Sequence, residues 1–386
     1  MFERELLQLE QQHLLRKPVI VESYHGQRIM IGNRSLLLMC SNDYLGLSQH
    51  PALKQAAMSA MDLYGFGSGA SRLVSGTSRI HQELEHNISL FKKTEATVLF
   101  NSGYAANTGV IPALAREGDS VFSDSLNHAS IIDGCRLSRA SLRIYGHKDM
   151  NHLETLLKDD GNTGQKLIIT DGVFSMDGDI APLPDLVTLA EKYDALLMVD
   201  DAHATGVLGK GGRGTVEHFG LDGRVPIQMG TLGKAFGSCG AYVSGSRNLI
   251  DFLLNRSRSY IYSTALPPAV CAASLAALKI IDNEPARRKK LWHNRDRFMA
   301  GMKSLRIDLG SSETPILPWM IGDTEKAVKV GARLFESSIF AAAVRPPSVP
   351  DGTSRIRMTL MASFSDHDID MALAAVNKIQ VEVIST

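Results

Sequence analysis

Cysteine is scarce in this sequence, which has four in 386 residues, at Cys40, Cys135, Cys239 and Cys271. They form no Cys-x-x-Cys pair, and neither a cysteine cluster nor a His-x-x-x-His pattern is present. A disulfide framework and a metal site are therefore not expected, and reduced structural thiols are.

Excess charge and long apolar runs are also missing. Forty-one basic residues balance forty-one acidic ones, which argues against binding to nucleic acid or to a membrane surface. The most apolar run, 269–278, is well short of the ~20 residues that a membrane helix needs. Residues 1–7 mix acids and bases and lack the apolar centre of a secretory signal. We therefore expect a cytoplasmic protein.

Short apolar runs alternate with amphipathic stretches of helical length between residues 96 and 243. Such alternation predicts an α/β fold with a mostly parallel sheet covered by helices on both faces. Ligands of such sheets bind beyond the carboxyl ends of the strands, so the loops after the runs are the informative ones. The runs are 98–100, 120–122, 142–145, 167–170, 195–199, 227–230 and 241–244.

The chain divides by pattern into three parts. We expect an N-terminal helix and arm over 1–45, a large ligand-binding domain over 46–285 and a small α+β domain over 286–386. One long helical stretch, from residue 268 to about 303, connects the last two. The small domain is predicted to contain strands at 315–321, 339–345 and 355–361 and helices at 325–337 and 366–378.

A lysine in a glycine-rich turn is the most informative feature. Lys234 lies in Gly-Thr-Leu-Gly-Lys-Ala-Phe-Gly just after an apolar run, and Asp200 and His203 end another run in Val-Asp-Asp-Ala-His. A lysine boxed in by small residues suits covalent binding of an aldehyde by its amine. Pyridoxal phosphate is the commonest such aldehyde, and its sites pair the lysine with an acidic partner for the pyridine nitrogen.

A phosphate site is predicted at Ser102-Gly103-Tyr104, where a strand ends and the helix 105–115 begins. Helix N-termini bind anions through free N–H groups and the helix dipole, and Thr231 could add a hydroxyl. Two other glycine patterns, at 65–70 and 209–214, resemble a dinucleotide fingerprint. Neither leaves a strand and opens a helix, so nicotinamide binding is not expected.

Other polar residues are open to more than one interpretation. His128 follows a strand and could stack on an aromatic cofactor. An amino-acid substrate carries a carboxylate, which a guanidinium fork binds well. Arg345, Arg355 and Arg357 are all candidates for that fork, and their residue types alone do not choose among them.

Seven motifs together resemble the α-oxoamine synthases, pyridoxal-phosphate enzymes of the aspartate-aminotransferase fold, or fold type I. The resemblance runs over essentially the whole chain. The motifs are CSNDYLGL at 40–47, GSGASRLVSG at 67–76, SDSLNHAS at 123–130, TDGVFSMDG at 170–178, VDDAHATG at 199–206, TLGKAFG at 231–237 and YSTALPP at 262–268.

The resemblance implies roles for individual residues. Lys234 holds the cofactor covalently, Asp200 pairs with the pyridine nitrogen, His203 with the ring hydroxyl, and His128 stacks on the ring. The remaining implied cofactor contacts are Gly103, Tyr104, Ser175, Thr231, Ser263 and Thr264. The implied substrate contacts are Arg16, Asn42, Ser348 and Arg357. Ser263 and Thr264 would reach the phosphate of a second subunit, so the resemblance also implies a homodimer.

The implied reaction is a decarboxylative condensation of an amino acid with an acyl thioester. We expect L-alanine and a pimeloyl group carried by coenzyme A or by acyl-carrier protein. The alternatives are glycine with acetyl-CoA, or a protein that binds pyridoxal phosphate without catalysis. Two positions depart from the family pattern: Phe364 where a histidine is usual, and Asp171 where glutamate is common.

Overall fold

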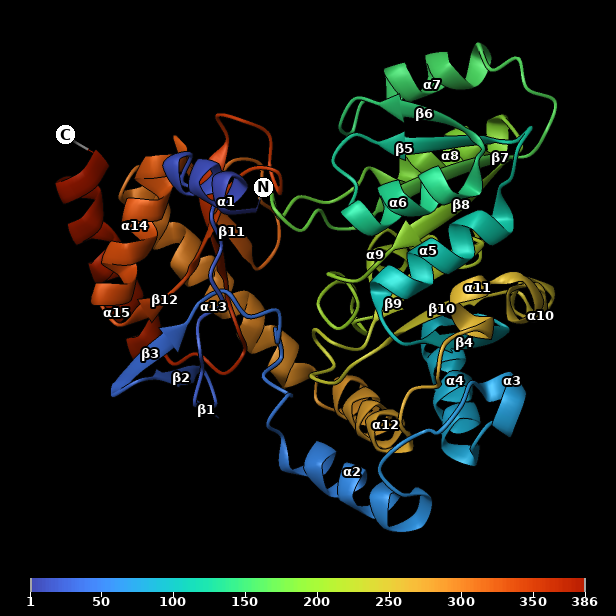
Figure 1. Ribbon diagram of the computed structural model, residues 1–386, viewed down its shortest axis with the longest axis horizontal. Helices are drawn as coiled ribbons and strands as arrows, with labels where there is room; N and C mark the ends of the chain where they lie inside the picture. The colour runs from blue at the N-terminus through green and yellow to red at the C-terminus, as the bar shows by residue number, and fades with distance from the viewer. Residues whose placement is uncertain (1, 385–386) are drawn as a thin grey trace. The chain divides into compact units, whose positions relative to one another are not determined.

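The computed structural model describes residues 2–384, which form two compact units. One, the sheet unit, consists of Leu47–Phe174 and Ile180–Arg288. The other, the split unit, is assembled from the described residues of 1–46, 175–179 and 289–386. Figure 1 colours both by position in the chain. The three predicted domain ranges stay predictions.

The sheet unit is built on seven strands in the order β4-β10-β9-β8-β7-β5-β6. β10 runs antiparallel to both β4 and β9, and the other neighbouring pairs are parallel. The mostly parallel α/β sheet predicted from the apolar runs is therefore confirmed. The strands are β4 (Ala96–Phe100), β5 (Ser120–Asp124), β6 (Ser141–Tyr145), β7 (Lys166–Asp171), β8 (Ala195–Asp200), β9 (Ile227–Thr231) and β10 (Ala241–Gly245).

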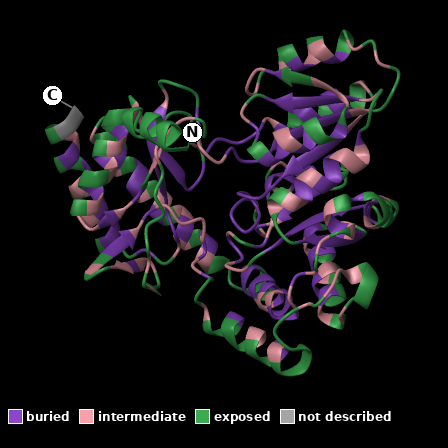
Figure 2. Cartoon of the chain, in the orientation of Figure 1, coloured by how far each residue is buried: buried purple, intermediate pink, exposed green. Residues whose placement is uncertain are grey.

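Alternate residues of each strand enter cores on opposite faces of this sheet. In β7, Leu167 and Ile169 pack with helices α5 (Gly103–Leu114), α6 (Ala129–Ser138) and α10 (Arg247–Arg256). Ile168 points the other way, into a core with α7 (Met150–Lys158) and α8 (Leu183–Lys192). Because both faces are covered, the strands are largely buried except for the edge strand β6, which has exposed residues (Figure 2). Such burial is expected for runs of continuous apolar character.

The remaining helices of the sheet unit begin and end at recognisable residues. Helix α2 starts with Pro51, its N-cap His50 accepts the N–H of Ala52, and Gly65 ends it with φ of 77°. Proline at the first position and glycine just past the end are the expected helix boundaries. These helices are α2 (Pro51–Tyr64), α3 (Arg72–Ser75), α4 (Arg79–Lys92), α9 (Thr215–His218), α11 (Arg258–Ile261) and α12 (Pro268–Asn283).

The split unit has two small sheets. One has the order β1-β2-β3-β12 and the other the order β11-β14-β13, in which both pairs are antiparallel. The strands are β1 (Ser23–His25), β2 (Arg28–Ile31), β3 (Arg34–Leu38), β11 (Ile316–Gly322), β12 (Ile339–Phe340), β13 (Ala342–Val344) and β14 (Ser354–Thr359). Its helices are α1 (Phe2–Gln11), α14 (Thr324–Glu336), α15 (Asp366–Ile379) and residues 289–304 of α13 (Pro285–Ser304), and a π-helical turn follows at Gln380–Ile384.

Three predicted elements differ from the structure. The helical stretch from 268 to 303 is two helices, because α12 ends at Asn283 and Pro285 opens α13. The strand expected at 339–345 is divided between β12 and β13, which belong to different sheets. The first helix ends at Gln11, before residue 16, and His13 has φ of 57°, outside the helical region.

Residues 2–384 contain neither a membrane-crossing helix nor a cluster of metal ligands. None of these helices combines the length and the apolar character that a membrane crossing requires. In the same residues, no group of three or more His, Cys, Asp or Glu side chains is arranged to hold a metal ion.

Candidate active site

Lys234 and His203 meet in the sheet unit. His203 lies in the turn after β8 and is buried, and Lys234 lies in the turn after β9 and is half-buried. The Nζ atom of Lys234 is 2.9 Å from Nε2 of His203, at hydrogen-bond distance. β8 and β9 are parallel neighbours, so the turns that follow them are brought to the same edge of the sheet.

Asp200 is the last residue of β8, and its carboxylate is almost fully buried. Its Oδ1 accepts the N–H of Ala202 at 2.9 Å, and its Oδ2 accepts a hydrogen from Nδ2 of Asn107 at 2.9 Å. A buried carboxylate held by donors at both oxygens has one fixed orientation and retains lone pairs for a further donor.

His128 is the N-cap of α6 and is open to solvent. Its Nδ1 accepts the N–H of Ser130 at 3.2 Å and lies 2.7 Å from Oγ of the same serine. Protein atoms crowded around the ring remove part of its hydration, which lowers the pKa of His128. The charge of Lys234 lowers it further, while Asp200 acts in the opposite direction. The neutral imidazole, which can stack on a ring, is therefore favoured.

Asp171, at the end of β7, supports the same region. Its Oδ2 accepts the backbone N–H of His128 at 2.7 Å, and its own N–H donates to Oδ1 of Asn127 at 2.8 Å. Burial and the neighbouring Asp200 raise the pKa of Asp171 well above its ordinary value. Asp171, which is shorter than the glutamate common at this position in the family, thus anchors the loop that carries His128.

Gly103 opens α5 and packs so closely against Thr231 and Met229 that there is no room for a side chain at this position. A Cβ atom built on Gly103 would lie 2.8 Å from Cγ2 of Thr231 and 3.1 Å from Cε of Met229. Ser102 caps the helix by accepting the N–H of Ala105 at 3.1 Å. The N–H groups of the first turn have no acceptor within the helix. An anion therefore finds donors there, with a threonine hydroxyl nearby.

Three other predicted cofactor contacts in the sheet unit are placed less directly. Tyr104 is exposed, and its hydroxyl donates to the carboxylate of Asp133 on α6. The carbonyl of Thr264 accepts a hydrogen from Nδ2 of Asn101 at 2.6 Å, and Thr264 itself is exposed. Ser263 is half-buried. Their roles toward a cofactor stay predictions.

The split unit gathers Arg357, Asn42 and Ser175. Arg357 is buried on β14, donates through Nε to the carbonyl of Ser175 and through Nη2 to Oδ1 of Asn42 at 3.1 Å. Both acceptors are neutral, and no carboxylate of residues 2–384 forms an ion pair with Arg357. Arg355, by contrast, pairs with Asp177 at 2.5 Å. Of these two arginines, Arg357 is the one that can take a carboxylate from outside.

Arg16 and Ser348 also meet in the split unit. Nη2 of Arg16 donates to the carbonyl of Arg345 at 3.3 Å and to that of Pro346 at 3.0 Å. The N–H of Ser348 donates to the same carbonyl of Arg345 at 3.1 Å. The guanidinium of Arg345 donates to the carbonyls of Leu15 and Ala343. Arg345 therefore holds the segment that carries Arg16.

Two residues that contact Asp200 and His128, namely Asn107 and Ser130, were not identified as site residues from the sequence. Asn107, on α5, bonds to Asp200 and to Oγ of Ser130, and both Asn107 and Ser130 are buried. The available signal was an amide among the buried apolar residues of a helix, beside Ala106 and Val110. A polar residue in such a position indicates a buried partner.

Comparison with known proteins identifies the class. The family model described as aminotransferase class I and II matches residues 34–376, and the chain belongs to that family. The predicted membership of the α-oxoamine synthases, which are fold type I enzymes dependent on pyridoxal phosphate, is confirmed.

Curated relatives give the narrower likeness. The chain is 51% identical over 381 residues to the 8-amino-7-oxononanoate synthase of Geobacter sulfurreducens. The aligned region covers 98% of this chain and 97% of that protein. It is 50% identical over 380 residues to the enzyme of the same name from Symbiobacterium thermophilum, with the same coverage.

Solved structures agree on the fold. A serine palmitoyltransferase from Sphingomonas wittichii has a TM-score of 0.94 at 30% identity and covers 100% of this chain and 97% of its own. A serine palmitoyltransferase of S. paucimobilis, solved with pyridoxal phosphate and myriocin, has a TM-score of 0.95 at 29% identity, covering 100% and 98%. The 8-amino-7-oxononanoate synthase of Francisella tularensis has a TM-score of 0.77 at 32% identity, covering 91% and 99%.

The residues of the sheet unit fit pyridoxal phosphate. An amine is available at Lys234, a buried carboxylate at Asp200 and a neutral imidazole at His128. The N-terminus of α5, which Ser102 caps and against which Thr231 packs closely at Gly103, suits a phosphate. The cofactor expected from the sequence is thus consistent with the donor set that the fold assembles.

Proposed function

We propose that the chain catalyses the condensation of L-alanine with a pimeloyl thioester to give 8-amino-7-oxononanoate, carbon dioxide and the free thiol, a step of biotin biosynthesis. The observation that carries the proposal is the 51% identity, over nearly the full length of both proteins, to a relative of that name. The acyl carrier is coenzyme A or acyl-carrier protein.

In this proposal the sheet unit binds the cofactor and moves the proton. Pyridoxal phosphate, when bound, supplies an aldehyde for amines and an electron-withdrawing ring. Lys234 Nζ would be the amine that holds the aldehyde, and as a free amine it would accept the α-proton of alanine. Asp200 keeps a proton at the pyridine nitrogen, and His203 donates to the ring hydroxyl. His128 stacks on the ring.

The phosphate contacts in this proposal come from one edge of the sheet unit and from a second subunit. The first turn of α5, with Gly103 and Tyr104, and the hydroxyl of Thr231 bind the phosphate. Ser263 and Thr264 are assigned to the phosphate of a partner subunit in a homodimer. The exposed apolar side chains Leu63, Phe66 and Val74 support such an interface, because they are 74%, 82% and 80% accessible. The mass of the protein in solution measures whether it is a dimer.

The split unit is assigned to substrate recognition. Arg357, held by Asn42 and the carbonyl of Ser175, binds the carboxylate of alanine. Ser175 also contacts the cofactor in this assignment, while Arg16 and Ser348 contact the acyl substrate. Arg357→Lys should raise KM for alanine by about tenfold or more, the loss expected when a bidentate charged pair is broken. Arg355→Lys, which changes an arginine already paired with Asp177, is the matched control.

The decisive assay measures free thiol released from defined substrate pairs. L-Alanine, glycine and L-serine are each combined with pimeloyl-, acetyl- and palmitoyl-CoA, and pimeloyl-acyl-carrier protein is tested with alanine. We expect alanine with a pimeloyl donor to be fastest, and Lys234→Ala to abolish it. Faster release from glycine with acetyl-CoA would instead support the glycine acetyltransferase alternative. Cofactor binding without turnover of any pair would indicate a non-catalytic protein.

A further inference from the structure

A single buried amide joins two of the groups assigned to the cofactor ring. Asn107 is completely buried on α5. Its Nδ2 lies 2.9 Å from Oδ2 of Asp200 and 2.9 Å from Oγ of Ser130. The partner carboxylate can only accept, so the orientation of the amide is determined by its contacts: the NH2 group faces both acceptors.

The contact to Ser130 extends to His128. Because Oγ of Ser130 accepts from Asn107, its own hydrogen is available for Nδ1 of His128, 2.7 Å away. The backbone N–H of Ser130 points at the same nitrogen. Nδ1 is therefore an acceptor, and the ring carries its proton on Nε2. The chain of contacts thus runs from the carboxylate at the end of β8 to the imidazole at the start of α6.

The oxygen of the amide shows that simple packing does not explain this residue. Oδ1 of Asn107 is buried and has no hydrogen-bond partner in the described part of the chain. An unsatisfied buried oxygen is unfavourable, and the residue lies between the buried apolar residues Ala106 and Val110 of α5. A leucine would fill this volume without an orphan oxygen, but would leave Asp200 and Ser130 without their donor.

We propose that Asn107 is a positioning residue, whose amide fixes the carboxylate of Asp200 and, through Ser130, the imidazole of His128 in one arrangement. The proposal rests on the cofactor roles proposed for Asp200 and His128. Asn107 itself is not assigned any contact with cofactor or substrate. Its effect is to hold Asp200, assigned to the pyridine nitrogen, and His128, assigned to the ring face, in fixed relative positions before the cofactor binds.

Asn294 in the split unit provides a matched control. It is also completely buried, its Nδ2 donates to the carbonyls of Met361 and Phe364 at 2.9 and 3.0 Å, and its Oδ1 is likewise without a partner. Both of these hydrogen bonds are made to backbone carbonyls. Asn294→Leu and Asn107→Leu therefore make the same chemical change, and only the second removes donors from the ring-contacting groups.

The experiment compares Asn107→Leu, Ser130→Ala, Asp200→Asn and Asn294→Leu in the full-length protein. Pyridoxal phosphate is titrated into cofactor-free protein to give Kd, the bound-cofactor absorption is followed against pH, and thermal unfolding is recorded without cofactor. The titratable groups around the ring site are Asp200, Asp171, His128, His203 and Lys234, and their identities are unchanged in Asn107→Leu.

Asn107→Leu should weaken binding of pyridoxal phosphate by about tenfold, as expected when a hydrogen bond to a charged group is lost. It should also shift the pH midpoint of the absorption change upward by about half a unit or more. A less firmly protonated ring repels the proton on the Lys234 nitrogen less, so that proton is lost at higher pH. Ser130→Ala removes only the hydroxyl that links Asn107 to His128, and it should weaken binding of pyridoxal phosphate by about threefold.

The control decides the interpretation. Asn294→Leu should leave Kd and the midpoint unchanged even if its unfolding temperature falls. The positioning role is wrong if Asn107→Leu, like Asn294→Leu, leaves both Kd and the pH midpoint unchanged. It is also wrong if Ser130→Ala leaves Kd unchanged in a protein that unfolds normally. Should Asn107→Leu not fold, Ser130→Ala decides alone. If Asp200→Asn also leaves the midpoint unchanged, the proposed role of Asp200 fails, which is a separate result.

Discussion

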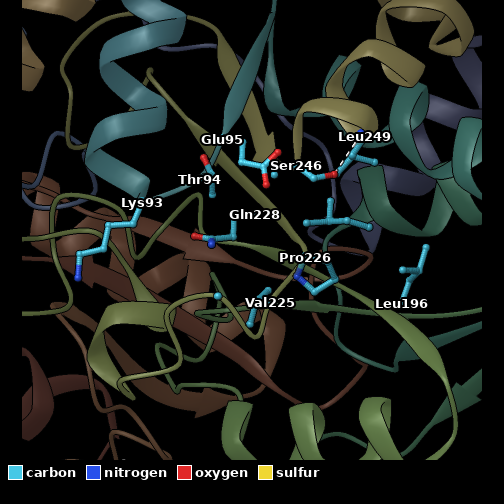
Figure 3. A pocket seen from close by; sticks show the side chains of 12 residues that line it. Lys93, Thr94, Glu95, Leu196, Val225, Pro226, Gln228, Ser246 and Leu249 are labelled. Carbon is cyan, nitrogen blue, oxygen red and sulfur yellow. Dashed lines mark hydrogen bonds between the residues drawn. The ribbon is translucent and has the colours of Figure 1, made fainter.

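The carboxyl edge of the seven-stranded sheet carries the polar residues of the candidate site, whereas its amino edge carries a cavity. At the carboxyl ends of β8 and β9 lie Asp200 and Thr231, with the turns that carry His203 and Lys234. At the amino ends of the same strands lies a cavity of about 600 Å³. Figure 3 shows its lining side chains, among them Leu196, Val225, Pro226 and Leu249.

The polar groups around this cavity are mostly paired with each other or with backbone. Glu95 accepts the N–H of Arg247 at 2.8 Å, Ser246 caps α10 by accepting the N–H of Leu249 at 3.2 Å, and Lys93 pairs with Asp222 at 2.7 Å. Gln228 has an oxygen without a partner, but that oxygen is buried away from solvent. This cavity therefore lacks converging reactive groups, and the residues to which we assign the chemistry lie at the opposite edge.

A carboxylate-to-amide change at each edge gives the largest expected contrast. Asp200→Asn should lower kcat/KM by about 10²–10⁴-fold, the range typical for a group that controls protonation at the reacting centre. Glu95→Gln makes the same change at the amino edge and keeps an acceptor for Arg247, so its kcat/KM should stay within about twofold of the parent. Steady-state kinetics with alanine and pimeloyl-CoA measures both. Equal losses would remove the distinction between the edges.

A smaller effect concerns stability against pH at the carboxyl edge. Burial and Asp200 raise the pKa of Asp171 above its value in the unfolded chain. The stability that its carboxyl group contributes is therefore full below the unfolded pKa and is lost as pH rises through the folded pKa. Asp171→Asn removes that loss and keeps an oxygen for the N–H of His128.

The unfolding temperature of cofactor-free Asp171→Asn, relative to the parent, should thus be higher at pH 9 than at pH 5, by about 2 °C or more. Differential scanning calorimetry at both pH values measures it. A difference that is the same at both values would mean that this carboxyl group does not change its ionisation on folding.

The smallest effect is expected from filling the cavity. Leu249→Phe adds volume at the amino edge, where space is available, and should leave kcat/KM within about twofold and change stability by less than ~1.5 kcal/mol. Activity assays and urea unfolding measure the two quantities. A loss of activity above tenfold with normal stability would show that this edge communicates with the reaction.

The sheet and its functional edge could be predicted because both follow from local pattern. Each of the seven apolar runs became a strand, since buried strands need continuous apolar side chains. Parallel topology then brings loops such as those of Asp200 and Lys234 to one edge, however far apart they are in the sequence. The approach of Lys234 to His203 is therefore a consequence of strand order.

Residues whose role depends on a particular partner could not be predicted. Asn107 bonds to residues 23 and 93 positions away, and nothing near it in the sequence indicates either. Residue types alone left Arg355 and Arg357 open, and only the family resemblance indicated Arg357. The structure adds the physical reason, because Asp177 already pairs with Arg355. Ser175 follows β7 in the sequence, yet it is grouped with the split unit through contacts such as that with Arg357.

The divided origin of the split unit has a consequence for biosynthesis. All seven strands of the sheet unit have been translated once β10 ends at Gly245, so that sheet can form while the ribosome is still adding residues. β3, made among the first forty residues, pairs in parallel with β12 at Ile339 and Phe340. β1, β2 and β3 can pair with one another early, but the other edge of β3 must wait for β12, and a truncated product would leave that edge exposed to chaperones and proteases.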